Sequence, residues 1–177
     1  MALGSTIYKA EVILSNLNDH YYNDFSLTMA KHPSENEERM MRRLICFLVS
    51  AHEDLEFTKG LSSTDEPELW QKSLTGDILH WIELGEPDDK RIRQASGKSR
   101  KVTIFTFSEN TSEQWFFKIK DKVSHEKVNV IHLDNMSEED LSSLVTKSMK
   151  LSCTIEDNSL YLSNDESTIH IRLDKRL

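Results

Sequence analysis

No hydrophobic stretch of this sequence approaches the ~20 residues that are needed to span a bilayer. The start of the chain, MALGSTIYKAEV, lacks a basic segment followed by an apolar one, so we expect no export signal. There are only two cysteines, Cys46 and Cys153, which lie far apart without metal-type spacing. Reduced thiols in the cytoplasm are the simplest interpretation, and we predict a cytoplasmic protein that does not enter a membrane.

The length and composition of the chain are those of an ordinary globular domain. Its 177 residues suffice to bury a core, with 37% of them hydrophobic and 29% charged. No repeat, low-complexity segment or domain-sized linker divides the sequence. We therefore predict a single domain that comprises residues 1–177.

Basic residues gather in one segment although the net charge is −8. The negative charge argues against a protein whose whole surface grips nucleic acid, because phosphate binding needs clustered Lys and Arg. A local patch is still open, since six of the 22 basic residues fall in residues 90–101, without an acid among them: Lys90, Arg91, Arg93, Lys98, Arg100 and Lys101. This segment is either a solvated helix face or a patch that binds DNA or RNA phosphates.

The order of strand and helix patterns predicts an α/β fold with a central mixed sheet flanked by helices. Hydrophobic patterns predict an initial hairpin and a final antiparallel group of strands (5–14, 23–32, 150–157, 159–173). Strands and helices alternate between them, which implies parallel pairing there. The intervening strands are expected at 55–61, 76–85, 101–107 and 127–133.

Helices are predicted from caps and periodicity. The clearest covers most of residues 32–55, with Ser34 as its N-cap and a buried face at helical spacing: Met40, Met41, Leu44, Phe47, Leu48 and Ala51. A capped helical turn is expected at 64–73, with Asp65 as N-cap, and a full helix at 137–149. Two more helices are expected at 90–101 and 111–123.

An acid lies inside the hydrophobic strand DILHWIELG. Alternation places Glu83 on the same face as Leu79 and Trp81, which is a costly position for a carboxylate unless a partner compensates it. Asp77 begins the same strand on the solvent side and is too far along it to share a metal with Glu83. Glu83 therefore stands out as a candidate site residue.

The long helix offers a possible partner for Glu83. On a helical wheel, Glu38 lies at the margin of the buried stripe and Ser34 inside its edge, whereas Glu35, Arg39 and Arg42 point outward. Glu38 could therefore reach over the sheet. Ion pairs between residues four apart, Glu35 with Arg39 and Glu38 with Arg42, explain the same acids equally well.

Four strings together resemble the YaeQ family of bacterial proteins over nearly the whole chain: STIYKA, SLTMAKHPSENEERMMRRLICFL, LEFTKGLSSTDEPELW and WIELGEPDDKRI. The resemblance implies a variant of the restriction-endonuclease-like PD-(D/E)XK nuclease fold. It also implies a metal-dependent phosphodiesterase-like site. The nuclease pattern has an acid from the first helix, an acid on one strand and Glu-x-Lys on the next strand, followed by a helix.

Carried over to this sequence, the resemblance makes Glu38 the helix acid and Glu83 the acid of Glu-x-Lys. The lysine position is occupied by Gly85, so Lys90 or Arg91 of the following helix is a candidate for the missing charge. Candidates for the other strand acid are Glu56 and Asp65, although Asp65 is more simply a helix cap.

The leading hypothesis is a Mg²⁺-dependent nuclease-like or nucleic-acid-processing protein. In it Glu38, Glu83 and Glu56 hold the metal, and Lys90 acts in catalysis. Phosphate binding is assigned to another group of residues: Ser34, Arg91, Arg93, Lys98 and Arg100. The alternative hypothesis is a catalytically degenerate nuclease fold that binds protein or nucleic acid.

Overall fold

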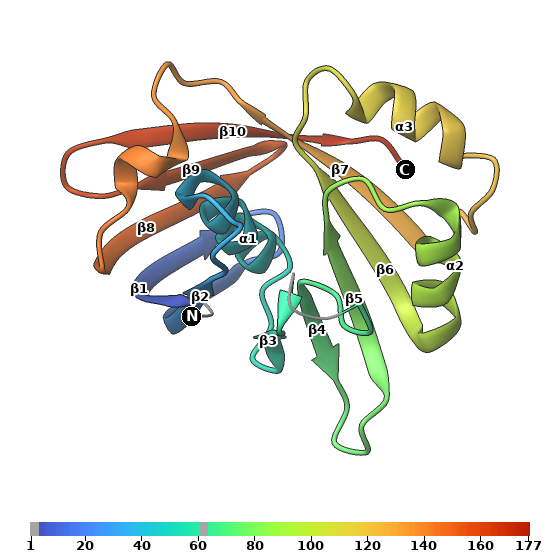
Figure 1. Ribbon diagram of the computed structural model, residues 1–177. Helices are drawn as coiled ribbons and strands as arrows, with labels where there is room; N and C mark the ends of the chain where they lie inside the picture. The colour runs from blue at the N-terminus through green and yellow to red at the C-terminus, as the bar shows by residue number, and fades with distance from the viewer. Residues whose placement is uncertain (1–3, 61–63) are drawn as a thin grey trace. The chain divides into compact units, whose positions relative to one another are not determined.

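The computed structural model describes residues 4–60 and 64–177, and the chain forms two compact units (Figure 1). Unit 1 comprises residues 1–49 and 135–173, and unit 2 comprises residues 50–134 and 174–177. Each unit contains helices and a mixed sheet, which confirms the predicted α/β class. The assignment of the whole chain to a single domain stays a prediction.

Five strands build the sheet of unit 1, in the order β2-β1-β8-β9-β10. They are β1 (Thr6–Asn16), β2 (Tyr21–Lys31), β8 (Ser148–Glu156), β9 (Ser159–Ser163) and β10 (Thr168–Lys175), whose last two residues belong to unit 2. The predicted hairpin is confirmed, because β1 and β2 pair antiparallel. The final strands also pair antiparallel as predicted, while β1 and β8 are parallel.

The core of unit 1 lies between its sheet and the helix α1 (Glu37–Val49). Strict alternation along β1 buries Tyr8, Ala10, Val12 and Leu14 on one face. The predicted apolar stripe of α1 is buried, and Phe47 packs edge-on against Phe25 of β2, with ring centroids 5.1 Å apart.

The start of α1 differs from the prediction. Asn36, not Ser34, caps the helix, since its side chain accepts a hydrogen bond of 2.8 Å from the amide of Arg39. Ser34 lies outside the helix and bonds the ring of His32. Ala51 likewise lies beyond the end of α1. The sequence offers several small polar residues before the helix, and only the turn geometry selects between them.

Glu35 is buried, although the helical wheel predicted that it points outward. The wheel does not apply to it because the helix begins two residues later. Arg43 binds the Glu35 carboxylate in a bidentate manner, with Nε–Oε2 2.9 Å and Nη2–Oε1 2.6 Å, and also reaches the carbonyl of Ala30 in β2. Arg39 adds the predicted ion pair at 2.7 Å. This cluster ties the start of α1 to the sheet.

Unit 2 contains the strand order β7-β6-β5-β4-β3. The strands are β3 (Leu55–Phe57), β4 (Leu69–Lys72), β5 (Ile78–Leu84), β6 (Ser99–Thr106) and β7 (Val128–Asn135), of which Asn135 belongs to unit 1. β3, β4 and β5 pair antiparallel, and β5, β6 and β7 pair parallel, as the alternation of strands and helices predicts. Backbone hydrogen bonds join Arg176 and Leu177 to Val130 of β7.

Two helices connect the parallel strands of unit 2, α2 (Asp89–Lys98) and α3 (Ser112–Ile119). Asp88 caps α2 by accepting a hydrogen bond from the amide of Arg91, so Pro87–Asp88 is a turn and helix start. Buried residues of the helices and of β5, β6 and β7 form one core: Trp81, Ile92, Ala95, Val102, Ile104, Ile119, Val128 and Val130. This core fixes α2 against the strand that carries Glu83.

Two predicted helices are wrong. Residues 64–73 contain the strand β4 instead of a helical turn, because Leu69, Trp70 and Gln71 pair with β5. Asp65 therefore caps no helix. Residues 137–149 contain only the short 3-10 helix η2 (Leu141–Leu144) and then enter β8. Local capping signals favoured helices here, and pairing with neighbouring strands overrides them.

No helix in residues 4–60 and 64–177 is long and apolar enough to cross a membrane.

The buried ion pair of unit 1 leads to a stability prediction. Arg43→Met leaves the Glu35 carboxylate, 1% exposed in its side chain, without its bidentate partner. We expect a loss of roughly 3–5 kcal/mol in the free energy of unfolding, as for other buried pairs that lose one member. Urea denaturation measures this loss.

The matched control is Arg93→Met, which removes an exposed pair with Asp89 on α2. Exposed pairs of this spacing contribute about 0.3–0.5 kcal/mol. Equal losses in the two variants would contradict the structural role of Arg43.

Candidate functional site

Glu83 of β5 lies in a half-buried cluster of polar groups in unit 2. Its side chain is 13% exposed, and its Oε1 accepts two hydrogen bonds. One comes from Trp81 Nε1 at 2.8 Å and the other from Arg91 Nε at 2.7 Å. The contact with Trp81 confirms that the two residues share a strand face, as the alternation predicts.

Arg91 connects three parts of unit 2 at this point. It lies in the first turn of α2, binds Glu83 and stands 5.2 Å from the centre of the Trp81 ring. Its other nitrogens donate to the backbone carbonyls of Thr64 and Glu66, the latter at 2.8 Å. The guanidinium therefore compensates the carboxylate and holds the segment that precedes β4.

A second buried carboxylate, Glu68, accompanies Glu83. Glu68 directly precedes β4 and is only 6% exposed. Its amide donates to the carbonyl of Ile82, the residue before Glu83, at 3.0 Å. Burial contributes most to the raised pKa of the Glu83 carboxyl, and the negative charge of Glu68 adds a smaller contribution in the same direction.

Burial is the largest cause of the raised pKa of Glu83. The hydrogen bond from Trp81 and the charge and hydrogen bond of Arg91 oppose it, and the charge of Glu68 adds to it. The net direction is upward, so Arg91 does not fully compensate the ionised form. A half-buried acid with a perturbed pKa and a specific charge partner is typical of functional sites.

Glu38 belongs to unit 1 and has local partners there. Its Oε2 accepts a hydrogen bond of 3.0 Å from the amide of Ser142 at the start of η2. Its Oε1 lies 3.3 Å from Arg42, which is the ion pair that the sequence predicts as an alternative role. In unit 1, Glu38 thus joins α1 to η2.

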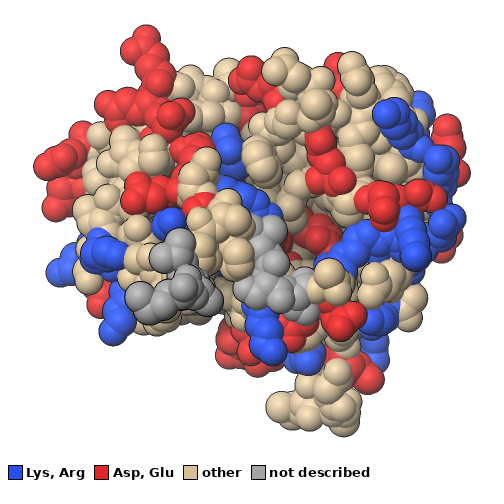
Figure 2. Space-filling model, viewed as in Figure 1, with Lys and Arg blue, Asp and Glu red and all other residues tan. Residues whose placement is uncertain are grey.

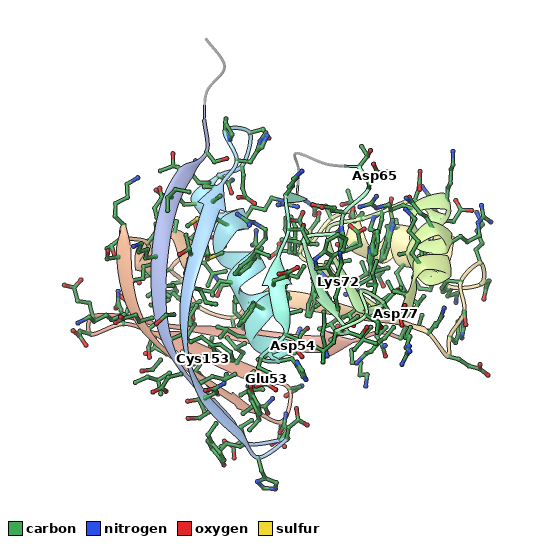
Figure 3. All side chains as sticks on the ribbon, turned by 90° about the horizontal axis from the view of Figure 1, so that it is seen from below. Glu53, Asp54, Asp65, Lys72, Asp77 and Cys153 are labelled. Carbon is green, nitrogen blue, oxygen red and sulfur yellow. The ribbon has the colours of Figure 1, made fainter. Side chains whose placement is uncertain are left out.

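The other predicted site residues are mostly exposed. Glu56 of β3 accepts a hydrogen bond of 2.8 Å from Trp70 Nε1, and Asp65 lies in the segment before β4 (Figure 3). Lys90, Arg93 and Lys98 are exposed on α2, where Figure 2 shows basic and acidic side chains next to each other. Ser34 is exposed in unit 1. Arg100 lies in β6, because α2 ends at Lys98 and does not extend to residue 101.

Whether this cluster could bind a magnesium ion depends on which side-chain oxygens it offers as ligands. Among the described residues no group of three or more His, Cys, Asp and Glu side chains is arranged to hold a metal. Mg²⁺, however, usually keeps several waters and binds through one or two carboxylates together with substrate phosphates. The carboxylates of Glu68 and Glu83 fit that smaller requirement, and the set of Glu38, Glu83 and Glu56 stays a prediction.

Glu83 and Arg91 are candidates from the sequence, whereas Glu68 is not among the residues that the sequence singles out. The reason is the helical turn assigned to residues 64–73, which hides the strand that Glu68 precedes. An acid followed by the alternating Leu69, Trp70 and Gln71 is a weak strand signal that could have identified it. The approach of Glu68 to β5 depends on strand register, which no local pattern determines.

Comparison with known proteins gives consistent matches over the chain. The family model described as YaeQ protein matches residues 1–173. The "Uncharacterized protein YaeQ" of Escherichia coli (strain K12) is 39% identical over 174 residues, which cover 98% of this chain and 96% of that protein. The protein of the same name from Salmonella typhi is 38% identical over 174 residues, which again cover 98% of this chain and 96% of that protein.

Two crystal structures are similar to the whole chain. That of YaeQ protein from Xanthomonas axonopodis pv. citri has a TM-score of 0.92 at 35% identity and covers 97% of this chain and 98% of its own. That of YaeQ protein from Pseudomonas syringae has a TM-score of 0.88 at 30% identity, with 98% and 96% covered.

The raised pKa of Glu83 predicts a specific dependence of stability on pH. An acid whose pKa is raised on folding binds its proton more tightly in the folded state. Its contribution to stability is full below the unfolded-state pKa, near 4.5, and is lost as the pH rises through the folded-state pKa. In Glu83→Gln this loss is absent, so the variant should gain stability relative to wild type as the pH rises from 4 to 8.

Urea denaturation across this pH range measures the difference. When Glu68 is changed to Gln in both proteins, the stability difference caused by Glu83→Gln should appear at lower pH. The reason is that the charge of Glu68, which contributes to the raised pKa of Glu83, is gone. A difference between wild type and Glu83→Gln that does not change with pH would contradict the assignment.

Proposed function

This chain belongs to the YaeQ family, and from the polar cluster of unit 2 we propose that it is a metal-dependent phosphodiesterase that acts on nucleic acid. One observation carries the proposal. Two carboxylates, the buried Glu68 and the half-buried Glu83, lie close enough for one to influence the other, and burial raises the pKa of Glu83 although Trp81 and Arg91 oppose that rise. A divalent cation is the ligand that such a pair favours.

The order of the residues along unit 2 supports a nuclease-like arrangement. The nuclease pattern places an acid on one strand, an acid on the next strand and then a helix. Glu68 precedes β4, Glu83 lies in β5, and α2 follows. We propose that Glu68 is the strand acid for which the sequence offered only Glu56 and Asp65.

The missing lysine has a structural reason. β5 ends at Leu84, and Gly85 has φ +125°, a backbone conformation that residues with a side chain rarely adopt. A lysine at this position would strain the turn into α2. Arg91, one turn into α2, provides a cation beside Glu83 instead. We propose that Arg91 takes the role that the sequence assigned to either Lys90 or Arg91.

Each residue then has a defined task. Glu68 and Glu83 would hold the metal through their carboxylate oxygens. A metal held there would supply an activated water and would stabilise charge on the phosphate. The Nε of Arg91, which donates to Glu83 in this structure, would be the donor for a phosphate oxygen if Glu83 bound the metal. Trp81 orients the Glu83 carboxylate through its indole N–H.

A second candidate function is binding of nucleic acid without cleavage. The contacts of Arg91 favour it, because its nitrogens already bind Glu83 and two backbone carbonyls. In that case the Arg91–Glu83 pair serves only to hold the segment before β4 to α2. The exposed cations of α2 and β6 would then make the contact with phosphates.

Cleavage distinguishes the two functions. With Mn²⁺ or Mg²⁺, wild type should cleave DNA or RNA, and Glu68→Gln or Glu83→Gln should reduce the rate by orders of magnitude. The assay uses labelled single- and double-stranded DNA and RNA, with EDTA as the blank. Glu56→Gln is the matched control, since it removes an exposed carboxylate on neighbouring β3.

Glu38→Gln tests the helix acid in the same assay. A rate that stays equal in wild type, Glu68→Gln and Glu83→Gln would indicate a contaminating nuclease and reject the phosphodiesterase. Nucleic-acid binding that persists without cleavage would then support the second candidate.

A further inference from the structure

The hairpin between β4 and β5 presents a large apolar side chain to solvent. Leu74, at its tip, has a relative exposure of 107%, whereas the next most exposed large hydrophobic among the described residues, Tyr22, reaches 59%. In Figure 1 the hairpin projects beyond the other strands of unit 2. A fully exposed leucine at the end of a projection contributes nothing to the core, and a single apolar side chain placed in this way has the form of the wedges that some proteins insert between base steps.

Hydrogen bonds within residues 73–77 stabilise the turn at the tip of the hairpin. The amide of Ser73 donates to the carbonyl of Asp77 at 2.8 Å, and the amide of Gly76 donates to the carbonyl of Ser73 at 3.0 Å. Side chains add to this, with Ser73 Oγ 2.9 Å from Thr75 Oγ1 and 3.1 Å from the amide of Asp77. Gly76 has φ +91°, which the turn requires. Leu74 is thus held out by an ordered turn and does not belong to a loose loop.

Cations lie beside the tip. Ile78, the first residue of β5 after the turn, pairs with Ser99, and this pairing brings the end of the turn next to the start of β6. The two segments line an open hollow of about 510 Å³ that includes Lys98 and Arg100. Lys101 is exposed in the same strand, and Lys72 and Asp77 mark the hairpin itself in Figure 3.

Arg100 is available for a phosphate. Its nearest acid, Asp77, is 3.9 Å away, and both side chains are more than 60% exposed, so their attraction is weak. In Figure 2 the end of the hairpin is an uncharged projection, with both basic and acidic side chains above it.

We propose that the β4–β5 hairpin is a wedge that inserts Leu74 between base pairs of a nucleic-acid duplex, while Lys98 and Arg100 bind the flanking phosphates. This rests on the proposed function for its choice of nucleic acid. Apolar wedges such as leucine unstack base steps, and nearby cations neutralise phosphates. A membrane anchor is less well supported, since the tip offers one large apolar side chain and interfacial binding depends on a larger apolar area.

A fluorescent duplex tests the wedge without any metal. The probe is a short DNA duplex with 2-aminopurine beside a flexible TA step, in EDTA and low salt. Wild type should bind and raise the fluorescence several-fold, because unstacking relieves quenching. Leu74→Ala should bind within about threefold of wild type, since the phosphate contacts remain, but should lose most of the fluorescence rise. Leu17→Ala, at an exposed leucine of unit 1, is the control and should behave as wild type.

The salt dependence tests the cations. Changing Lys98 and Arg100 together to Gln should lower the slope of log K against log salt by about two, one for each phosphate contact. An unchanged slope, or no binding of wild type to the duplex, would overturn the proposal. So would an equal fluorescence rise in wild type and Leu74→Ala.

The remaining outcomes are also decisive. Binding of wild type to anionic vesicles that Leu74→Ala loses, without unstacking of the duplex, would identify a lipid contact and overturn the wedge. Because the probe is used in EDTA, failure of cleavage does not affect this result. A wedge that unstacks DNA in a protein that never cleaves would leave this inference intact and reject only the phosphodiesterase.

Discussion

The contact between Arg91 and Glu83 is the interaction on which the candidate site depends. It joins the first turn of α2 to β5, and through the carbonyls of Thr64 and Glu66 it also fixes the segment before β4. Glu68 lies at the end of that segment and is buried against the same strand. Without the guanidinium, the half-buried Glu83 carboxylate would lose its ion-pair partner. Arg91 therefore holds together the elements that carry the two candidate acids, Glu68 and Glu83.

The cluster combines burial with opposing charges. Burial is the main cause of the raised pKa of Glu83, while Trp81 and Arg91 oppose the rise and Glu68 adds to it. The Glu35 cluster of unit 1 differs, because two cations, Arg39 and Arg43, bind its single carboxylate. Proteins commonly retain such local destabilisation where a ligand relieves it. A divalent metal bound by the two acids would relieve it, because the metal offsets their negative charge.

Much of the fold follows from the sequence, because hydrophobic periodicity identifies nearly all the strands and all three α-helices. Glu83 is also accessible from sequence, since an acid among Leu79, Trp81 and Ile82 breaks the pattern of its strand. The errors occur where local and tertiary preferences conflict. Residues 64–73 and 137–149 carry helix caps, yet they form strands or a short turn because neighbouring strands pair with them. Glu35 and Glu68 are buried by long-range contacts with Arg43 and β5, which no spacing along the chain reveals.

The central claim is that Glu68 and Glu83 together hold a divalent metal. Titration calorimetry with Mn²⁺ tests it most directly, because it needs no knowledge of the substrate. The account predicts binding of one ion to wild type and to Glu56→Gln, and loss of that binding in both Glu68→Gln and Glu83→Gln. Equal Mn²⁺ binding in wild type and in both variants, or no binding to wild type at millimolar metal, would contradict it.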